Sequence, residues 1–311
     1  MIKRGLVLSL LVILILLLVG CSGKSSTPDQ RIQQDVYSGS RGLDIKFVSN
    51  LPPSRIYDQG VIDILTELEN KGASDLSGSN CYIHISGYDP SIIRGLDTEK
   101  QCGESLWGKS TSFPEGGRSN LEFRTDTIRL PEGVESLQQK FILSACYKYE
   151  TLASPVVCID PQQYKIKSIT DACTVRDVSL GGGQGAPVSV SRVGVDMIGS
   201  DKVRFQIRIS NVGGGTVLRR GTSISGRGGS SCPTNLDFDD YNIIDYQVQM
   251  SGGSLITCSP DKIRMVNVNA ELFCTFRIKG ESAYTTPLQI RLLYNYLDSV
   301  SKSVEILKTP E

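Results

Sequence analysis

The chain has 311 residues, and its 33 basic and 33 acidic side chains leave no formal net charge. This balance excludes the strong basic excess of a nucleic-acid-binding protein, so we expect no nucleic-acid partner. Nine cysteines stand beside a single histidine, which argues against a structural zinc site. The length is sufficient for two domains.

The first 21 residues have the layout of an export signal. Lys3 and Arg4 precede an uncharged, largely apolar run from Leu6 to Val19. This run is shorter than the roughly 20 residues that span a bilayer comfortably. A short positive segment, a short apolar run and small residues at a cut site are typical of a secretory signal. We therefore expect the rest of the chain on the extracytoplasmic face, at the cell surface or in the periplasm.

The end of this segment, Leu18-Val19-Gly20-Cys21, resembles the lipobox of prokaryotic lipoproteins. In that family the peptide is cut before the cysteine, whose thiol then carries lipid. The resemblance implies that Cys21 is the lipidated mature N-terminus. The alternative is an uncleaved signal-anchor helix that contains a cysteine. In both interpretations Lys3 and Arg4 keep the N-terminus cytoplasmic, and a lipid or helix attaches the protein to the membrane.

A tether and a series of strands follow the signal. Residues 22–42 are rich in Ser, Gly, Gln and charge, which predicts a flexible tether of roughly 25 Å. Beyond residue 42 apolar and polar residues alternate, and this period of two predicts half-buried strands. The clearest examples are Val203–Asn211 and Leu288–Tyr296.

Both of these strands have an earlier counterpart. Residues 62–70 align with 203–211, and residues 141–149 align with 288–296, at offsets of 141 and 147 positions. Two matches in the same order predict an internal duplication. We expect one domain over 43–163 and a second over 164–311, each ending in a hairpin with an aromatic and β-branched inward face.

The predicted fold class is all-β, with two tandem β-sandwiches. Many short strands are separated by Gly, Pro, Ser and Asp turns, as is typical of sandwiches. The run Asn211-Val-Gly-Gly-Gly and the strand layout resemble the immunoglobulin-like modules of prokaryotic surface proteins, including the CARDB type. This resemblance implies an immunoglobulin-like topology. The buried tryptophan of antibody domains has no equivalent here, because Trp107 falls in a predicted loop.

Apart from Cys21, eight cysteines remain, and an even number in an exported chain predicts disulfides. Cys146 and Cys158 have no counterpart in the second copy and lie symmetrically about Leu152, so we predict a bridge across the first hairpin. Cys81–Cys102 then follows for the first copy. The remaining cysteines leave two connectivities open: Cys232–Cys258 with Cys173–Cys274, or Cys258–Cys274 with Cys173–Cys232.

Few residues suggest catalysis. His84 could serve as a general base, but its strand context favours an outward-facing structural histidine, and spacing identifies no nucleophile beside it. Ser259–Lys262 and Ser299–Lys302 match Ser-x-x-Lys, yet both lie in predicted hairpins without the companion motifs of penicillin-binding enzymes. The glycine-rich segment 181–187 leads into a strand, which predicts a loop rather than a phosphate cradle. We expect no catalytic residue and no cofactor.

One loop is a candidate for recognition. The segment 213–240 is longer than its counterpart in the first copy, and long loops on rigid sandwiches often bind partners. Its candidate binding residues are Arg219, Arg220, Arg227, Asp237, Asp239 and Asp240. Asp237 and Asp239 could offer oxygen ligands to calcium, but a solvated acidic turn is the preferred interpretation, so no metal site is predicted.

Together these features predict a membrane-anchored, non-catalytic binding or structural protein of the cell envelope, with an envelope protein or a glycan as its partner. One alternative is an accessory subunit of a larger envelope complex, such as a secretion, pilus or surface-layer assembly, which stoichiometric co-purification would reveal. A second is an envelope hydrolase or ligand-capturing protein, which would need a concave site with perturbed acids.

Overall fold

The structure is a computed structural model that describes residues 36–163, 172–224, 232–233 and 236–310. These residues form strands, turns and loops, with a 3-10 turn at Phe238–Asp240. The predicted all-β class is confirmed. Within the described ranges, no helix has the length and apolar character needed to cross a membrane. The predicted signal, Cys21 and residues 22–35 lie outside the described residues.

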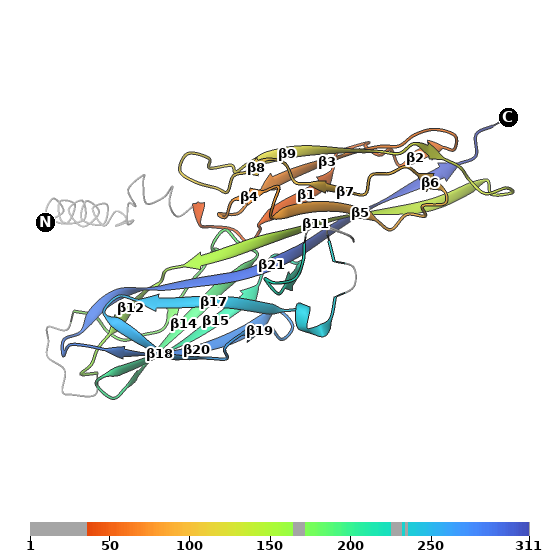
Figure 1. The fold of residues 1–311 in the computed structure, drawn as a ribbon. Coiled ribbons are helices and arrows are strands. Elements are labelled where there is room, and N and C mark those ends of the chain that lie inside the picture. The colour runs from red at the N-terminus through yellow and green to blue at the C-terminus, as the bar shows by residue number, and fades with distance from the viewer. Residues whose placement is uncertain (1–35, 164–171, 225–231, 234–235, 311) are drawn as a thin grey trace, which may run out of the picture.

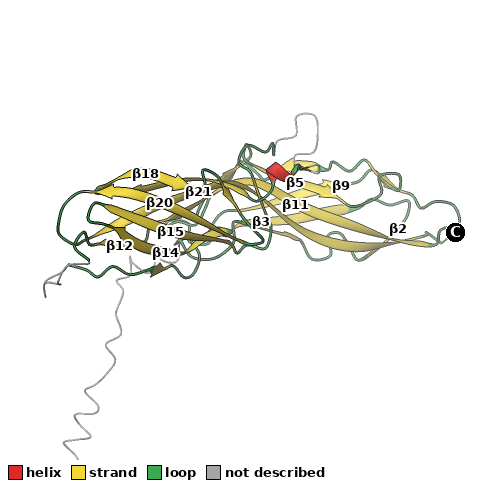
Figure 2. Cartoon of the chain, turned by 90° about the horizontal axis from the view of Figure 1, so that it is seen from below, coloured by secondary structure: helices red, strands yellow, loops and turns green. Residues whose placement is uncertain are grey.

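Two long strands form the centre of the molecule. β11 (Ser136–Ala153) and β21 (Tyr284–Leu307) pair antiparallel over the whole of β11. Figure 1 shows both strands passing from one lobe into the other. The sheet that contains them, in the order β19-β17-β21-β11-β5-β7, is therefore shared by the two lobes. Figure 2 shows the lobes lying end to end along this pair.

The first lobe is a sandwich of two sheets. One sheet consists of β1 (Leu43–Phe47), β3 (Asp63–Asn70) and β9 (Arg118–Arg124). The other contains β2 (Arg55–Tyr57), β5 (Cys81–Ser86), β7 (Glu99–Gln101), the start of β11 and the end of β21. Short pairs complete the lobe: β4 (Leu76–Ser77) with β8 (Ser105–Leu106), and β6 (Ile93–Arg94) with β10 (Thr127–Ile128).

The second lobe repeats this plan. Its five-stranded sheet consists of β13 (Val178–Ser179), β14 (Val188–Ile198), β15 (Lys202–Asn211), β20 (Asn269–Ile278) and β18 (Gly253–Ser259). The opposite sheet contains β12 (Val156–Ile159), β16 (Thr216–Leu218), β17 (Ile243–Met250), β19 (Ile263–Arg264) and the remaining parts of β11 and β21. The alternation in β15 has the predicted result, since Val203, Phe205, Ile207 and Ile209 are all completely buried.

The hairpin predicted at the end of each copy is wrong. β11 continues straight to Ala153, and β12 then pairs with Tyr284–Pro287 of β21 rather than folding back on β11. In the second copy the whole segment from Tyr284 to Leu307 is one strand. Each copy supplies the other with a longer partner than its own hairpin could. The boundary expected at residues 163 and 164 therefore divides the two copies of the sequence but not the two lobes.

The two copies are related by a pseudo-two-fold axis through the central strand pair. Lys148 of β11 faces Asn295 of β21, and these residues are 147 positions apart, which is the offset between the aligned copies. A residue that pairs with its own counterpart marks the axis of an antiparallel two-fold arrangement. The predicted duplication is thus expressed as an approximate symmetry within one chain.

Four tyrosines surround this axis and repeat the same hydrogen bonds on each side. Their rings are buried against one another with centroids 5.6–6.3 Å apart: Tyr147, Tyr149, Tyr294 and Tyr296. The Tyr147 hydroxyl accepts a bond from the Leu43 amide and the Tyr294 hydroxyl one from the Val188 amide, both at 3.3 Å. Tyr149 and Tyr296 likewise accept bonds from the Ser74 and Gly215 amides. The equivalence of these bonds supports the symmetry independently of strand register.

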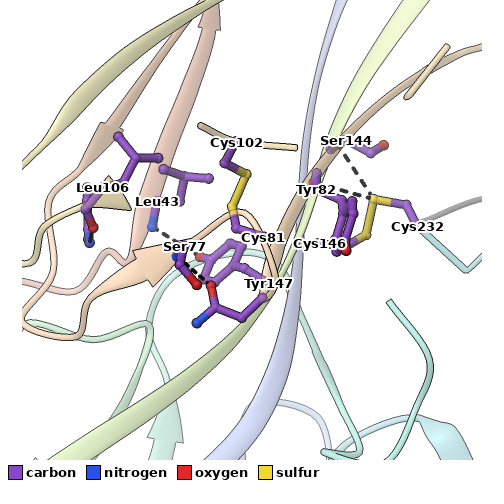
Figure 3. The surroundings of a disulfide bond; sticks show 12 residues. Leu43, Ser77, Cys81, Tyr82, Cys102, Leu106, Ser144, Cys146, Tyr147 and Cys232 are labelled. Atoms are coloured by element: carbon purple, nitrogen blue, oxygen red, sulfur yellow. Dashed lines mark hydrogen bonds between the residues drawn. A yellow bond between two sulfur atoms is a disulfide. The ribbon is translucent and has the colours of Figure 1, made fainter. Parts of the chain in front are cut away.

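The eight cysteines other than Cys21 form four disulfides in the described part of the chain. Cys81–Cys102 has the predicted pairing, whereas the others are Cys146–Cys232, Cys158–Cys173 and Cys258–Cys274. The predicted Cys146–Cys158 bridge is wrong because β11 does not turn back at Leu152. Of the open pairings only Cys258–Cys274 is formed. Cys146 lies on the outer sheet face and meets Cys232 of the long loop instead (Figure 3). Four such bridges indicate an oxidising, extracytoplasmic environment.

The last residues of the predicted tether belong to the folded body. Val36 is buried, and the Gly39 amide donates to the Gly182 carbonyl at 2.6 Å. The Gly185 amide donates in turn to the Gly39 carbonyl at 3.1 Å. The glycine-rich segment 181–187, correctly expected to be a loop, therefore receives the incoming chain between the two lobes.

Candidate functional site

Three adjoining hollows that share Tyr37 form a groove at the waist between the lobes. Its largest hollow has a volume of about 1020 Å³, a second has about 490 Å³, and a narrow space of about 40 Å³ joins them. Tyr37 borders all three. We call this feature the waist groove; its principal side chains are Tyr37, Leu152, Gln247, Gln249, Gln289 and Arg291 in the larger hollow, and Trp107 and Phe113 in the smaller.

The floor of the larger hollow is the outer face of the shared sheet. Gln249 of β17 lies directly opposite Gln289 of β21, and Gln247 lies opposite Arg291. The alternate residues, such as Val248 and Ile290, are buried, so these polar side chains face outward. Within the described residues, none of the three glutamine side chains forms a hydrogen bond. Each amide is therefore available to donate to and accept from a ligand.

The charge on this floor is neutralised locally. Arg291 Nε donates to Glu150 Oε2 at 2.8 Å, across the β11–β21 pair. Leu152 lies beside this ion pair and remains 47% exposed. The larger hollow therefore offers uncharged amides, an aliphatic side chain and a compensated ion pair.

The smaller hollow presents aromatic rings. Trp107 and Phe113 are 51% and 53% exposed, and Tyr37 at the junction is 50% exposed. The loop that carries Trp107 is held firmly: the Gly117 amide donates to the Trp107 carbonyl at 2.7 Å, and a Cβ at Gly117 would lie only 2.6 Å from the Trp107 amide nitrogen. The Trp107 ring is consequently presented to solvent by a backbone that is held in place.

Ile224 and Cys232 of the long loop cover part of the outer sheet face of the first lobe. In the first lobe Cys146, Tyr82 and Leu297 pack beneath Ile224 and Cys232 of that loop. Asn295 at the axis donates to the Thr222 carbonyl at 2.8 Å. By the strand registers, the two-fold axis relates the floor residues Arg291 and Gln247 to Ser144 and His84 of the first lobe. The counterpart of the groove floor therefore lies beside the surface that Ile224 and Cys232 cover.

Three of the six predicted binding residues of the long loop contact one another, namely Arg219, Asp237 and Asp240, and Asp239 pairs with Arg264 of β19. Arg219 pairs with Asp240 at 3.0 Å, and Arg264 pairs with Asp239 at 2.8 Å. Burial would raise the pKa of the Asp240 carboxyl, but hydrogen bonds from Thr222, the Asp237 amide and Arg219 lower it. Arg220 is exposed, and Arg227 lies outside the described residues. These carboxylates therefore stabilise the loop and its 3-10 turn. In the described part no cluster of three or more His, Cys, Asp or Glu could hold a metal.

A second polar row lies on the first lobe. The strand registers place Glu99, His84, Ser144 and Ser299 side by side on neighbouring strands. These residue types resemble a nucleophile and its base, but Ser144 Oγ lies 2.9 Å from Ser299 Oγ and shares its hydrogen bond with that hydroxyl. Burial lowers the pKa of His84, so the imidazole is neutral near pH 7, and its Nδ1 has no hydrogen-bond partner among the described residues. This row lies outside the waist groove.

Comparison with known proteins yields little. No family model matches the chain, and no curated protein is similar to it. Among solved structures, the secreted serine protease VesC from Vibrio cholerae aligns at 11% identity and a TM-score of 0.21, over 88% of this chain and 53% of the protease. The chain thus spans about half of that protein. The CupB6 tip adhesin from Pseudomonas aeruginosa aligns at 11% identity and a TM-score of 0.15, over 88% and 97% of the two chains. Likeness at this level carries no argument about function.

Proposed function

We propose that the protein is a membrane-anchored, extracytoplasmic, non-catalytic binding protein of the cell envelope that holds its ligand in the waist groove. The observation that carries this proposal is the groove itself, where three unpaired glutamines and three exposed aromatic rings converge from segments far apart in the chain. The signal-like N-terminus and the lipobox resemblance at Cys21 support attachment, and four disulfides support an oxidising location.

Rigidity favours binding at this place. The strands β11 and β21 join the two lobes through one continuous ladder, and the loops that carry Tyr37 and Trp107 are hydrogen-bonded to the body of the molecule. A groove that is already formed loses little conformational entropy when a ligand enters it. The ligand would therefore bind to a fixed surface rather than order a mobile one.

The composition of the groove supports a non-catalytic role. Its floor contains one ion pair, Glu150–Arg291, whose charges are already matched. The single histidine of the chain, His84, lies elsewhere, on the outer face of the first lobe. A hydrolase would need a nucleophile and a base within hydrogen-bond reach at the site.

Attachment is tested by cell fractionation and mass spectrometry. The full chain should partition into detergent and carry a lipid mass on Cys21, and a Cys21→Ala variant should lose that mass. Retention of the variant in the membrane with its full N-terminal peptide would replace the lipid anchor by a signal-anchor helix. A soluble cytoplasmic product with reduced thiols would contradict the proposed location.

Binding is tested with the fluorescence of Trp107, the single tryptophan of the chain. A soluble envelope extract should change the emission of the folded protein. A Leu152→Arg variant, which places a bulky charge on the groove floor, should lose most of this response. Val266→Arg is the matched control, because Val266 is 73% exposed and is not among the groove residues. Equal responses from all three proteins would refute binding in the groove.

One observation favours a second function, that of an accessory subunit in an envelope complex. In the first lobe β7 pairs along the edge of β5, whereas in the second lobe β18 joins β20. The β17 edge from Asp245 to Met250 therefore has no strand partner among the described residues, and the nearby β18 edge exposes Leu255 and Ile256. Such edges accept a strand from another chain. A stoichiometric partner that co-purifies with the native protein, and is lost on Ile256→Lys substitution, would establish this role.

A further inference from the structure

We infer that the ligand of the waist groove is a neutral glycan, an extended chain of uncharged sugar units. This inference rests on the proposed binding function and adds the chemical class of the ligand. It follows from three properties of the groove: the kind of hydrogen-bonding groups on its floor, the presence of exposed rings at its other end, and the balance of its charges.

The floor matches the hydrogen-bonding needs of hydroxyl groups. A sugar hydroxyl both donates and accepts, and a primary amide does the same through its nitrogen and oxygen. Gln249 of β17 lies directly opposite Gln289 of β21, and Gln247 lies two positions from Gln249 along β17. Positions i and i+2 on a strand are separated by roughly 7 Å. The three amides therefore form a spaced, corner-shaped set to which neighbouring hydroxyls could bind.

The aromatic rings match the other part of a sugar. The C–H faces of a pyranose ring are apolar and pack against flat aromatic side chains, which offer a large apolar area with few rotatable bonds. Tyr37 stands between the amide floor and the Trp107 hollow, and each of these rings is about half exposed. A chain of sugars crossing the waist would meet amides at one end and rings at the other.

The charges argue against an acidic glycan. On the floor the Arg291 guanidinium is already bonded to Glu150. In the smaller hollow one carboxylate, Asp75, accepts a bond from the Gly108 amide at 2.7 Å, and one lysine, Lys109, is present. An acidic polymer would require a surplus of unpaired cations, and the groove supplies none beyond this single lysine.

The backbone argues against an extended peptide. Peptides are commonly recognised by main-chain hydrogen bonds to a free strand edge. On the groove floor β21 lies between β11 and β17, and both neighbours already occupy its backbone groups. The unpaired edge of β17 lies on the side away from β21, so over β21 only side chains face the ligand. The side chains present, amides and rings, satisfy hydroxyls without any main-chain pairing.

The experiment uses the full protein with the envelope extract described above, now treated in two ways. Periodate cleaves the vicinal diols of sugars, and a protease digests peptides. We expect the Trp107 emission change to disappear after periodate treatment and to survive protease. If the emission change is lost after protease treatment but survives periodate treatment, the glycan assignment is overturned, whereas binding in the groove still stands. If the untreated extract gives no groove-dependent signal, the proposed function itself fails.

Calorimetry with neutral and acidic oligosaccharides then tests which residues bind. A Gln249→Ala, Gln289→Ala double variant should bind a neutral oligosaccharide about tenfold more weakly, and Gln138→Ala on the first lobe should bind normally. Tyr37→Ala should bind the neutral oligosaccharide about fivefold more weakly. Tyr37→Phe, which keeps the ring, should have an affinity within about twofold of that of the unaltered protein. Preferential binding of acidic oligosaccharides, or equal affinities in all variants, would overturn the inference.

Discussion

At the scale of single residues, the tyrosine hydroxyls at the two-fold axis satisfy backbone groups that would otherwise be buried without a partner. The Tyr149 hydroxyl accepts from the Ser74 amide and donates to the Gly185 carbonyl. Replacing Tyr149 by Phe should lower the free energy of unfolding by about 1–3 kcal/mol. Tyr57→Phe, at a 57% exposed site, is the control and should change it little. Denaturant unfolding measures both, and equal effects would contradict the assigned role.

The same cluster predicts a limit to stability at high pH. Burial raises the pKa of Tyr296 from 10.0 to about 12, and it raises the pKa values of Tyr147 and Tyr294 as well. The folded protein therefore holds these phenol protons more tightly than the unfolded chain. This contribution to stability is complete below pH 10 and declines as the pH rises from 10 towards about 12.

The measurement follows tyrosinate absorbance and circular dichroism together across this alkaline range. Ionisation of the buried tyrosines should coincide with loss of the β signal. Full ionisation of all tyrosines in a protein that keeps its β signal would show that the cluster does not resist titration.

The residues of the groove were only partly visible in the sequence. Strict alternation around Gln247, Gln249 and Gln289 indicates outward-facing amides, and this much could be inferred from the strand pattern. The meeting of these amides with Tyr37 and Trp107 could not, because it depends on how separate segments meet at the waist. The length of the long loop and its charged residues predicted a binding site there, yet Arg219, Asp239 and Asp240 form ion pairs within the second lobe.

At the scale of elements, the Cys146–Cys232 bridge fixes the long loop over the outer face of the first lobe. It closes a loop of 86 residues, whereas Cys258–Cys274 closes one of 16. In the chain-entropy model the longer loop contributes about 1.5 kcal/mol more to stability. The double variant Cys146→Ser, Cys232→Ser should therefore lose more stability in denaturant than Cys258→Ser, Cys274→Ser. The reverse order, or a Cys146–Cys158 peptide in a non-reducing digest, would contradict the pairing.

The strands themselves were largely predictable, but their partners were not. Alternation located β3 and β15 almost completely and the middle parts of β11 and β21, because a half-buried strand has a period of two in its burial. The turn expected near Leu152 does not form, because a strand from the other copy offers β11 a longer ladder. The sequence pattern of one copy could not show this. The Cys146–Cys158 assignment depended on that turn and changed with it.

At the scale of the whole molecule, the exchange of strand ends makes the two lobes one cooperative unit. Neither lobe has a complete sheet without the strand of the other copy. The intact protein should unfold in a single calorimetric transition with equal calorimetric and van't Hoff enthalpies. Two resolved transitions would contradict this coupling.

Fragments provide a second measure of the same coupling. A fragment of residues 36–163 should remain largely unfolded alone, because β11 would keep its partner β5 but would expose the whole edge that pairs with β21. Addition of residues 172–310 should restore β structure in both fragments, as judged by circular dichroism. Independent folding of either fragment would mean that the exchanged strand ends are dispensable.

The self-matching pair Lys148–Asn295 has a consequence for the origin of the chain. A polypeptide holding one copy would contribute one central strand. Two such polypeptides could therefore pair these strands antiparallel about the same axis and associate isologously. Fusion of the two genes would then turn an obligate homodimer into a single chain. Once joined, the halves could diverge, and only the second of them carries a long loop whose Cys232 is bridged to the first lobe.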